Sequence, residues 1–213
     1  MAYQRYPSRN AKRNYFAMPN KIHSYPIHPA AYAVYAYIRY NRKEDPNLEK
    51  APEQLGISKK AFQKALDELT DHFLLQEFDG QYYLRCLCEE FKNCYLLPNE
   101  IFNLDLPVGA IAVYGFLLCC EDRATYQCYP SYQTIGESVG MSKSSVKKYV
   151  DCLIEKRLIY TEPTRVWGHD GKKRNGTLLY TIRPIYEAIE YHAQMQMKQM
   201  RVQQCKQPSV SRL

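Results

Sequence analysis

Residues 129–182 read YPSYQTIGESVGMSKSSVKKYVDCLIEKRLIYTEPTRVWGHDGKKRNGTLLYTI, and this stretch decides the fold of the chain. Ser131 follows a proline, and its hydroxyl can cap a helix by accepting from an unpaired amide of the first turn. Gly140 can take the positive φ that ends many helices. Ser142 can then cap a second helix. The pattern predicts two helices separated by a tight turn.

The second predicted helix, residues 142–156, has two different faces. One face is apolar at spacings of three and four and consists of Val146, Tyr149, Val150, Leu153 and Ile154. The remaining positions are mostly polar or basic. A short turn followed by such a helix suits docking in the major groove of DNA. The candidate DNA-binding residues on this helix are Ser142, Lys143, Ser144, Ser145, Lys147 and Lys148.

A basic hairpin is predicted to follow the second helix. Leu158–Thr161 and Thr177–Ile182 are short β-prone runs, and the loop between them carries turn signals at Asp170-Gly171 and Asn175-Gly176. We expect Trp167 to pack on the base of this hairpin, and the alternative is that it stacks on a sugar of the DNA. Positive charge at the tip of such a wing can lie along phosphates or enter the minor groove. The candidate residues in the wing, 164–176, are Arg165, Lys172, Lys173 and Arg174.

Each part of this pattern has a plainer explanation. A run of charge is usually a solvated face, and serine caps occur in all proteins. The combination of helix, glycine turn, serine-capped basic helix and basic hairpin is much more specific, and it favours binding to double-stranded DNA. The competing interpretation is a winged helix that docks other proteins.

Composition places the chain among globular proteins with one or two domains. It has 213 residues, a net charge of +7 and a sequence pI near 8.9, which mildly favours a polyanionic partner. The N-terminus is polar and no apolar run reaches the length of a membrane span, so we expect a cytoplasmic protein with reduced thiols and no membrane partner.

No catalytic or cofactor motif stands out. The sequence contains no GxxxxGK[ST], GxSxG or HExxH pattern, and its five histidines are scattered. The closest cysteines, Cys86, Cys88 and Cys94, do not have zinc-ligand spacing. We therefore expect no enzymatic activity, no metal and no cofactor.

Two segments of the chain recur. NYFAMPNKI at 14–22 returns as NCYLLPNEI at 93–101 (93 − 14 = 79), and GISK at 56–59 returns as GMSK at 140–143 (140 − 56 = 84). The change of offset places about five inserted residues around 123–129. We predict an α+β, mainly helical chain with two tandem winged helix-turn-helix domains and a C-terminal helix.

The predicted organisation has four parts. Residues 1–14 form a basic arm, 15–90 a first winged helix with a short wing, 91–184 a second with a basic wing, and 185–213 a C-terminal helix and tail. Asp105 is expected to cap an apolar, buried helix over 106–120. Further helices are expected over 29–41, 51–55 and 58–69, with a hairpin turn at Asp79-Gly80. Possible secondary DNA-binding residues are Lys59, Lys60, Gln63 and Lys64.

The C-terminal helix carries an apolar stripe at helical spacing, which consists of Ile185, Ile189, Ala193, Met197 and Met200. It could form a homodimer, bind replication proteins or pack back on its own domain. Methionine-rich faces adapt to partners, which favours an interaction helix.

The second half resembles a known family at five places. These are Leu97-Pro98, Tyr129-Pro130-Ser131, Ile135-Gly136, residues 139–142 and Ser145-Val146. The resemblance is to helix-turn-helix domains of plasmid and phage replication initiators, primosome-loading proteins and related bacterial regulators. It implies DNA recognition in replication initiation or transcription regulation of a mobile element. The alternative is a protein–protein interaction module of a replication complex with weak, non-specific DNA binding.

Overall fold

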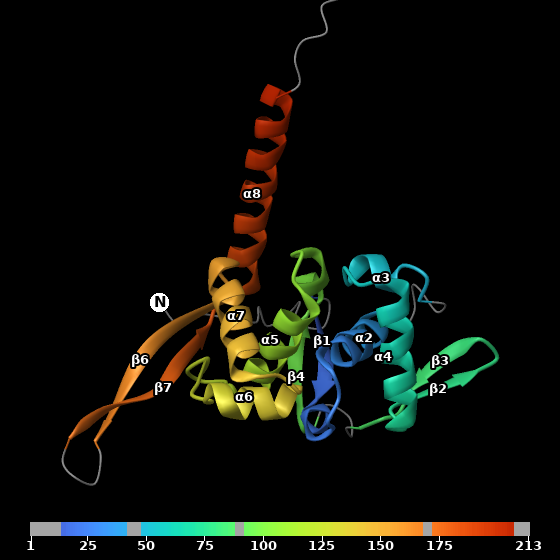
Figure 1. Cartoon of the computed structure of the whole chain (residues 1–213), viewed down its shortest axis with the longest axis horizontal. Coiled ribbons are helices and arrows are strands. Elements are labelled where there is room, and N and C mark those ends of the chain that lie inside the picture. The colour runs from blue at the N-terminus through green and yellow to red at the C-terminus, as the bar shows by residue number, and fades with distance from the viewer. Residues whose placement is uncertain (1–13, 42–47, 88–91, 168–171, 207–213) are drawn as a thin grey trace, which may run out of the picture.

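The computed structural model describes residues 14–41, 48–87, 92–167 and 172–206, and the predicted basic arm lies almost wholly outside them. The chain is mixed α and β and mainly helical (Figure 1). The first half contains β1 (Tyr15–Pro19), η1 (Asn20–Ser24), α2 (Pro29–Tyr40), α3 (Ala51–Gln54), α4 (Lys59–Asp71), β2 (Leu75–Phe78) and β3 (Gln81–Leu84). The second half contains β4 (Cys94–Pro98), η2 (Asn99–Asn103), α5 (Val108–Cys120), β5 (Gln127–Cys128), α6 (Tyr132–Val139), α7 (Lys143–Glu155), β6 (Ile159–Trp167), β7 (Lys173–Ile182) and α8 (Ile185–Lys206).

Equivalent elements of the two halves begin at constant separations. β1 and β4 begin 79 positions apart, as do α2 and α5, while α4 and α7 begin and end 84 positions apart. The non-glycine residues with positive φ after these last helices, Phe73 at 56° and Arg157 at 59°, are also 84 apart. The two halves therefore share these elements at matching positions, whereas α3 is shorter than α6 and the first hairpin is shorter than the second.

The halves meet across an antiparallel pair of strands. β1 pairs with β4, and Ala17 pairs with Leu96, the residue 79 positions later. The other pairs are symmetric about this one, since Tyr15 faces Pro98 and Pro19 faces Cys94. The ladder thus has an approximate two-fold relation at its centre.

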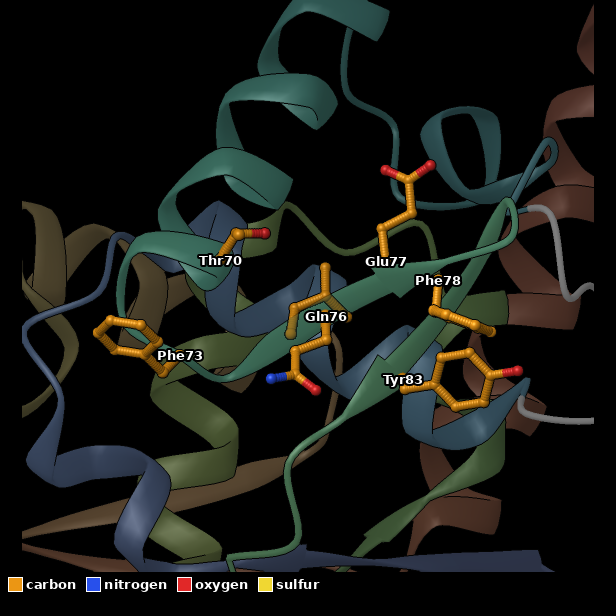
Figure 2. Close-up of a pocket in the computed structure, with 7 residues that line it drawn as sticks. Thr70, Phe73, Gln76, Glu77, Phe78 and Tyr83 are labelled. Atoms are coloured by element: carbon orange, nitrogen blue, oxygen red, sulfur yellow. The ribbon is translucent and has the colours of Figure 1, made fainter.

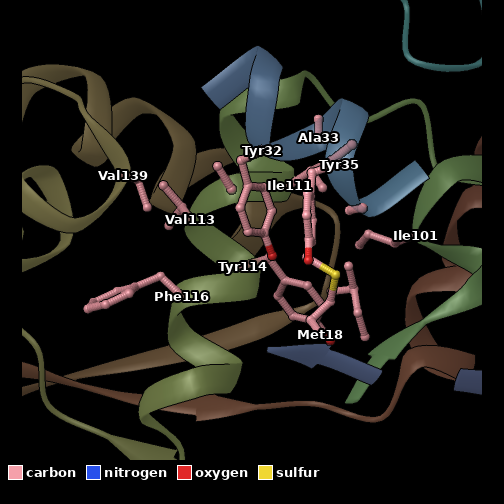
Figure 3. Packing of buried hydrophobic residues seen from close by; sticks show 14 of the residues in the cluster. Met18, Tyr32, Ala33, Tyr35, Ile101, Ile111, Val113, Tyr114, Phe116 and Val139 are labelled. Atoms are coloured by element: carbon pink, nitrogen blue, oxygen red, sulfur yellow. The ribbon is translucent and has the colours of Figure 1, made fainter. Parts of the chain in front are cut away.

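Helices α2 and α5 pack together behind this ladder, with α4 and α7 on their outer sides (Figure 1). Tyr35 and Tyr114 are equivalent residues of α2 and α5, and both are completely buried in the same cluster (Figure 3). A Cβ on Gly115 would overlap the Tyr32 hydroxyl, so glycine permits this close helix approach. One hydrophobic core joins the halves.

The prediction that the 106–120 helix is buried is confirmed, because every residue from 109 to 118 is buried. Its predicted start is wrong. The cap position is Pro107 rather than Asp105, which has a positive φ of 50°. Proline disfavours helical backbone in the preceding residue, so Leu106 cannot open the helix.

The first hairpin turns where predicted. Asp79 and Gly80 have φ values of 52° and 70°, as a two-residue type I′ turn requires. β2 pairs with β3 from Leu75–Leu84 to Phe78–Gln81. None of the helices described is long and apolar enough to cross a membrane.

Candidate nucleic-acid interface

The turn between α6 and α7 is held by two serine caps and a left-handed glycine. The Ser131 hydroxyl accepts from the Thr134 amide at 3.0 Å, and the Ser142 hydroxyl accepts from the Ser145 amide at 3.3 Å. Gly140 ends α6 with φ 66°. The predicted caps and turn are confirmed. The orientation of α7 relative to α6 therefore follows from local interactions of Ser131, Gly140 and Ser142.

Glycine at position 136 lets the turn fold back on α6. The Met141 amide donates to the Gly136 carbonyl at 2.9 Å. A Cβ on Gly136 would overlap the Met141 carbonyl oxygen. This position therefore needs glycine for a close approach, and not for an unusual φ.

Helix α7 separates its apolar and polar residues as predicted, except that Ile154, which was expected on the apolar face, is 37% exposed. Val146, Val150 and Leu153 are buried, and Tyr149 packs against α5 where Gly109 leaves room for its ring. The exposed face holds Lys143, Ser144, Lys147 and Lys148, whereas Ser145 is half-buried. The structure thus brings these candidate residues together on one side of one helix.

The N-terminal turn of α7 is suited to an anion. It contains no acidic residue, and Lys143 stands at its first position. Unpaired amides at a helix N-terminus favour negative charge. The hydroxyls of Ser144 and Ser145 each lie 3.0 Å from the Ser142 hydroxyl, so the three form one polar cluster at this end.

The wing is a longer paired hairpin than the sequence predicts. Pairing continues as far as Trp167–Lys173, with an irregularity between Pro163 and Arg165. Arg165 therefore lies on a strand, exposed and opposite Asn175. Lys172 is exposed beside the start of β7.

Asn175-Gly176 is not a turn, because both residues lie inside β7. A Cβ on Gly176 would overlap the Thr164 side chain, whose hydroxyl donates to the Thr177 carbonyl. Glycine here admits a cross-strand contact beside the irregular pairing. The other predicted turn, Asp170-Gly171, and the side chains of Lys173 and Arg174 lie outside the part of the chain that is described.

The prediction that Trp167 packs on the base of the wing is wrong. Its side chain is 70% exposed, and it pairs with Lys173 at the far end of β6. Because the strands stay paired beyond Pro163, the hairpin carries this residue away from the base. Figure 1 shows the hairpin projecting past α6 and α7.

Sequence reasoning missed the strand that anchors the wing. β5 pairs with β7 through Gln127–Thr181 and Cys128–Tyr180, so the sheet order is β5-β7-β6. Two residues are too few for a period-two pattern. The five-residue change in repeat offset around 123–129 was the one signal of extra structure there.

Helix α4 of the first half is similar to α7, but fewer positively charged residues surround it. Ser58 caps α4 by accepting from the Ala61 amide at 3.2 Å. The predicted secondary residues Lys59, Lys60, Gln63 and Lys64 are all exposed. The Gln63 amide donates to Asp67 at 2.9 Å. Residues 65–84 contain five acids and no lysine or arginine, so the hairpin beyond α4 offers no cation to a phosphate.

Among the residues that the structure describes, no three His, Cys, Asp or Glu side chains are grouped so that they could hold a metal ion.

Comparison with known proteins identifies the central part of the second half. A family model described as a helix-turn-helix domain matches residues 104–159, which include α5, α6 and α7. The chain therefore carries a helix-turn-helix domain. No curated protein matches the sequence significantly.

Among solved structures, the chain matches a possible transcriptional regulator from Methanosarcina mazei Go1, with 14% sequence identity and a TM-score of 0.36. The match covers 63% of this chain and 98% of that chain, a similarity too low to establish a shared fold.

Proposed function

We propose that the protein is a non-enzymatic, cytoplasmic DNA-binding protein that reads duplex DNA with helix 142–156 and the wing 164–176. The observation that carries this proposal is the exposed face of α7, where Lys143, Ser144, Lys147 and Lys148 lie together beside an N-terminal turn without acids. The biological role is replication initiation or transcription regulation in a bacterial mobile element such as a plasmid.

The proposed arrangement is two tandem winged helix-turn-helix units. Its support is the constant spacing of equivalent elements, the shared positive φ at Phe73 and Arg157, and serine caps at Ser58 and Ser142. In this arrangement α7 is the principal recognition helix and α4 a secondary one.

The two parts of the interface have different tasks. Serine and lysine side chains on α7 reach base edges and flanking phosphates in the major groove. Arg165 and Lys172, with the neighbouring cations of β7, hold the backbone or the minor groove. Contacts from the wing raise affinity for any sequence, while contacts from α7 supply discrimination.

The test is fluorescence anisotropy with mixed-sequence duplex DNA across a salt series. Replacing Lys172, Lys173 and Arg174 by alanine removes up to three phosphate contacts, so the slope of log K against log salt falls by up to about three units. The control replaces Arg85 and Lys92, which are exposed and lie outside α7, the wing and α8, and leaves the slope unchanged. A wing variant with the wild-type slope would overturn the proposed wing contact.

A second candidate function is a winged-helix module that docks replication proteins and touches DNA weakly. The exposed apolar residues of α8 favour it, since Met197 and Met200 are 55% and 54% exposed. The same residues support a homodimer through α8. Full DNA affinity after loss of the α7 lysines, with function lost after changes on α8, would favour the docking module.

A further inference from the structure

The first half carries an exposed aromatic face beside its hairpin. It consists of Phe73 after α4 and of Phe78 and Tyr83 on β2 and β3 (Figure 2). Phe73 and Phe78 are 72% and 74% exposed. These rings line an open pocket together with Thr70, Leu75, Gln76 and Glu77. Exposed apolar surface of this kind marks an interaction site more often than single exposed residues do.

At the position equivalent to Phe73, the second half is in contact with α8. Arg157, which is 84 positions after Phe73, lies with its guanidinium 4.5 Å from the centre of the Tyr191 ring on that helix. His192 lies 3.3 Å from the Asp105 carboxylate, and Ala188 is buried. Arg157 is thus in contact with α8 in the second half. The equivalent residue of the first half, Phe73, is exposed.

The distal part of α8, residues 194–203, has no such packing. All its residues are exposed, including Met195, Met197, Met200 and Val202. It continues the helix away from the body, and β2–β3 lies beyond α4 on the other side of the molecule (Figure 1). Because α8 is one continuous helix of 22 residues, its distal part cannot reach the aromatic face of its own chain.

Charge and chemistry match the two surfaces. Residues 65–84 carry five acids without lysine or arginine, and the acids Asp71, Glu77 and Asp79 are exposed. Distal α8 carries Lys198 and Arg201 and no acid. Thioether sulfur makes favourable contacts with aromatic rings. A basic, methionine-rich helix therefore complements an acidic, aromatic surface in both respects.

We propose that the aromatic face receives distal α8 from a second copy of the chain. The exchange is reciprocal in a closed dimer, so each copy contributes one helix and one aromatic face. This proposal rests on the self-association through α8 proposed above, and it names the surface that the helix binds. It is independent of DNA binding, which uses α7 and the wing.

The experiment is sedimentation velocity of the full chain without DNA over a range of concentrations. The face variant replaces Phe73 by Asn and Phe78 by Thr, which suit a left-handed and a strand position respectively. The helix variant replaces Met197 and Met200 by Gln, which keeps helix propensity. Each change removes contacts that matter in the dimer alone, so we expect at least about a tenfold weaker association from either one. The control replaces Tyr160, an exposed aromatic residue on β6, by Thr and associates as the wild type does.

Mixing the two variants separates this pairing from others. The face variant keeps its helix and the helix variant keeps its face, so a labelled mixture recovers one contact per dimer and associates more tightly than either variant alone.

Three results would overturn the proposal. A monomeric wild type at all concentrations removes the second copy as occupant. A face variant that associates normally, while the helix variant does not, assigns the helix to another surface such as α8 of the partner. A mixture that associates no better than its components excludes reciprocal exchange. Unchanged DNA affinity in both variants shows that DNA binding by α7 and the wing stands or falls separately.

Discussion

The hydroxyl oxygens of Tyr32 and Tyr95 lie 2.6 Å apart in the buried centre of the protein. Tyr32 belongs to α2 and Tyr95 to β4, so this hydrogen bond joins the two halves of the chain. The His23 Nε2 atom lies 3.0 Å from the Tyr95 hydroxyl, and its ring stacks on both tyrosines. Burial raises the pKa of Tyr95 well above its usual value, so the phenol stays neutral and can serve both neighbours.

Removal of the central hydroxyl should destabilise the junction of the two halves. Tyr95→Phe leaves the Tyr32 hydroxyl and the His23 ring without this partner in a dry site, at a cost of about 1–3 kcal/mol in the free energy of unfolding. Thermal or urea unfolding measures the loss. Tyr186→Phe removes a hydroxyl from an exposed side chain of α8 and should leave stability unchanged. Equal stability of the two variants would contradict a structural role for the hydrogen bond.

Stability should fall in acid because of His23. Burial lowers the pKa of His23 from 6.5 to about 4 in the folded protein. Between these two values the unfolded chain binds a proton that the folded chain excludes, so the free energy of unfolding falls as the pH drops through this range. The loss is about 3 kcal/mol when complete. Urea unfolding at a series of pH values measures it.

The matched variant for that measurement is His23→Gln. It carries no titrating group, whereas every carboxylate and the other histidines remain. The difference between the wild-type and variant curves therefore isolates His23. We expect the difference to be constant above pH 6.5 and to shrink below it. Parallel curves throughout would show that His23 is protonated as easily in the fold as in the unfolded chain.

Alanine substitutions at two equivalent glycines, Gly56 and Gly140, can distinguish the cost of backbone strain from the cost of a steric contact in the turn. Gly56 and Gly140 have φ values of 61° and 66°. A Cβ on Gly56 would meet nothing within 4 Å, whereas a Cβ on Gly140 would lie 3.1 Å from the Ile27 carbonyl oxygen. Gly56→Ala should cost about 1–2 kcal/mol through the left-handed conformation alone. Gly140→Ala should cost more, as the loss of thermal stability in each variant will show.

Sequence patterns located the turn and its helices because each depends on local chemistry. Ser131, Gly140 and Ser142 act on amides and carbonyls within a few residues, and the alternation of Val146 and Val150 with lysines follows one helix. The repeat at offsets of 79 and 84 likewise needed only the order of residues. Such features are visible without knowledge of the tertiary structure.

Features that depend on distant partners were not predictable in the same way. Asn175-Gly176 has the composition of a turn, but both residues lie inside β7, which pairs with β6, and Thr164 occupies the space that a Cβ on Gly176 would need. β5 exists through pairing with β7, and its own two residues carry no strand pattern. Trp167 was misplaced for the same reason, since the length of the paired wing sets its distance from the base.

The second half of the repeat should bind DNA more tightly than the first. Helix α7 exposes Lys143, Lys147 and Lys148, and α4 likewise exposes three lysines, Lys59, Lys60 and Lys64. At the offset of 84, Lys59 and Lys64 are equivalent to Lys143 and Lys148, whereas Lys60 is equivalent to Ser144. Beyond α7 stands a hairpin with Arg165 and further cations, whereas residues 72–84 beyond α4 carry the acids Glu77 and Asp79 and no lysine or arginine. A helix that lacks a second positive anchor makes fewer phosphate contacts, and the acids repel the backbone.

Alanine at the three α7 positions should therefore weaken duplex binding at least about tenfold more than alanine at the three α4 positions. Both triple variants remove the same charge, so a difference between them cannot come from net charge. Anisotropy at several salt concentrations measures both affinity and slope. Equal losses would mean that the two helices contact DNA alike, and that the acidic hairpin lies far enough from the backbone to be screened. A larger loss from α4 would reverse the assignment of the principal recognition helix.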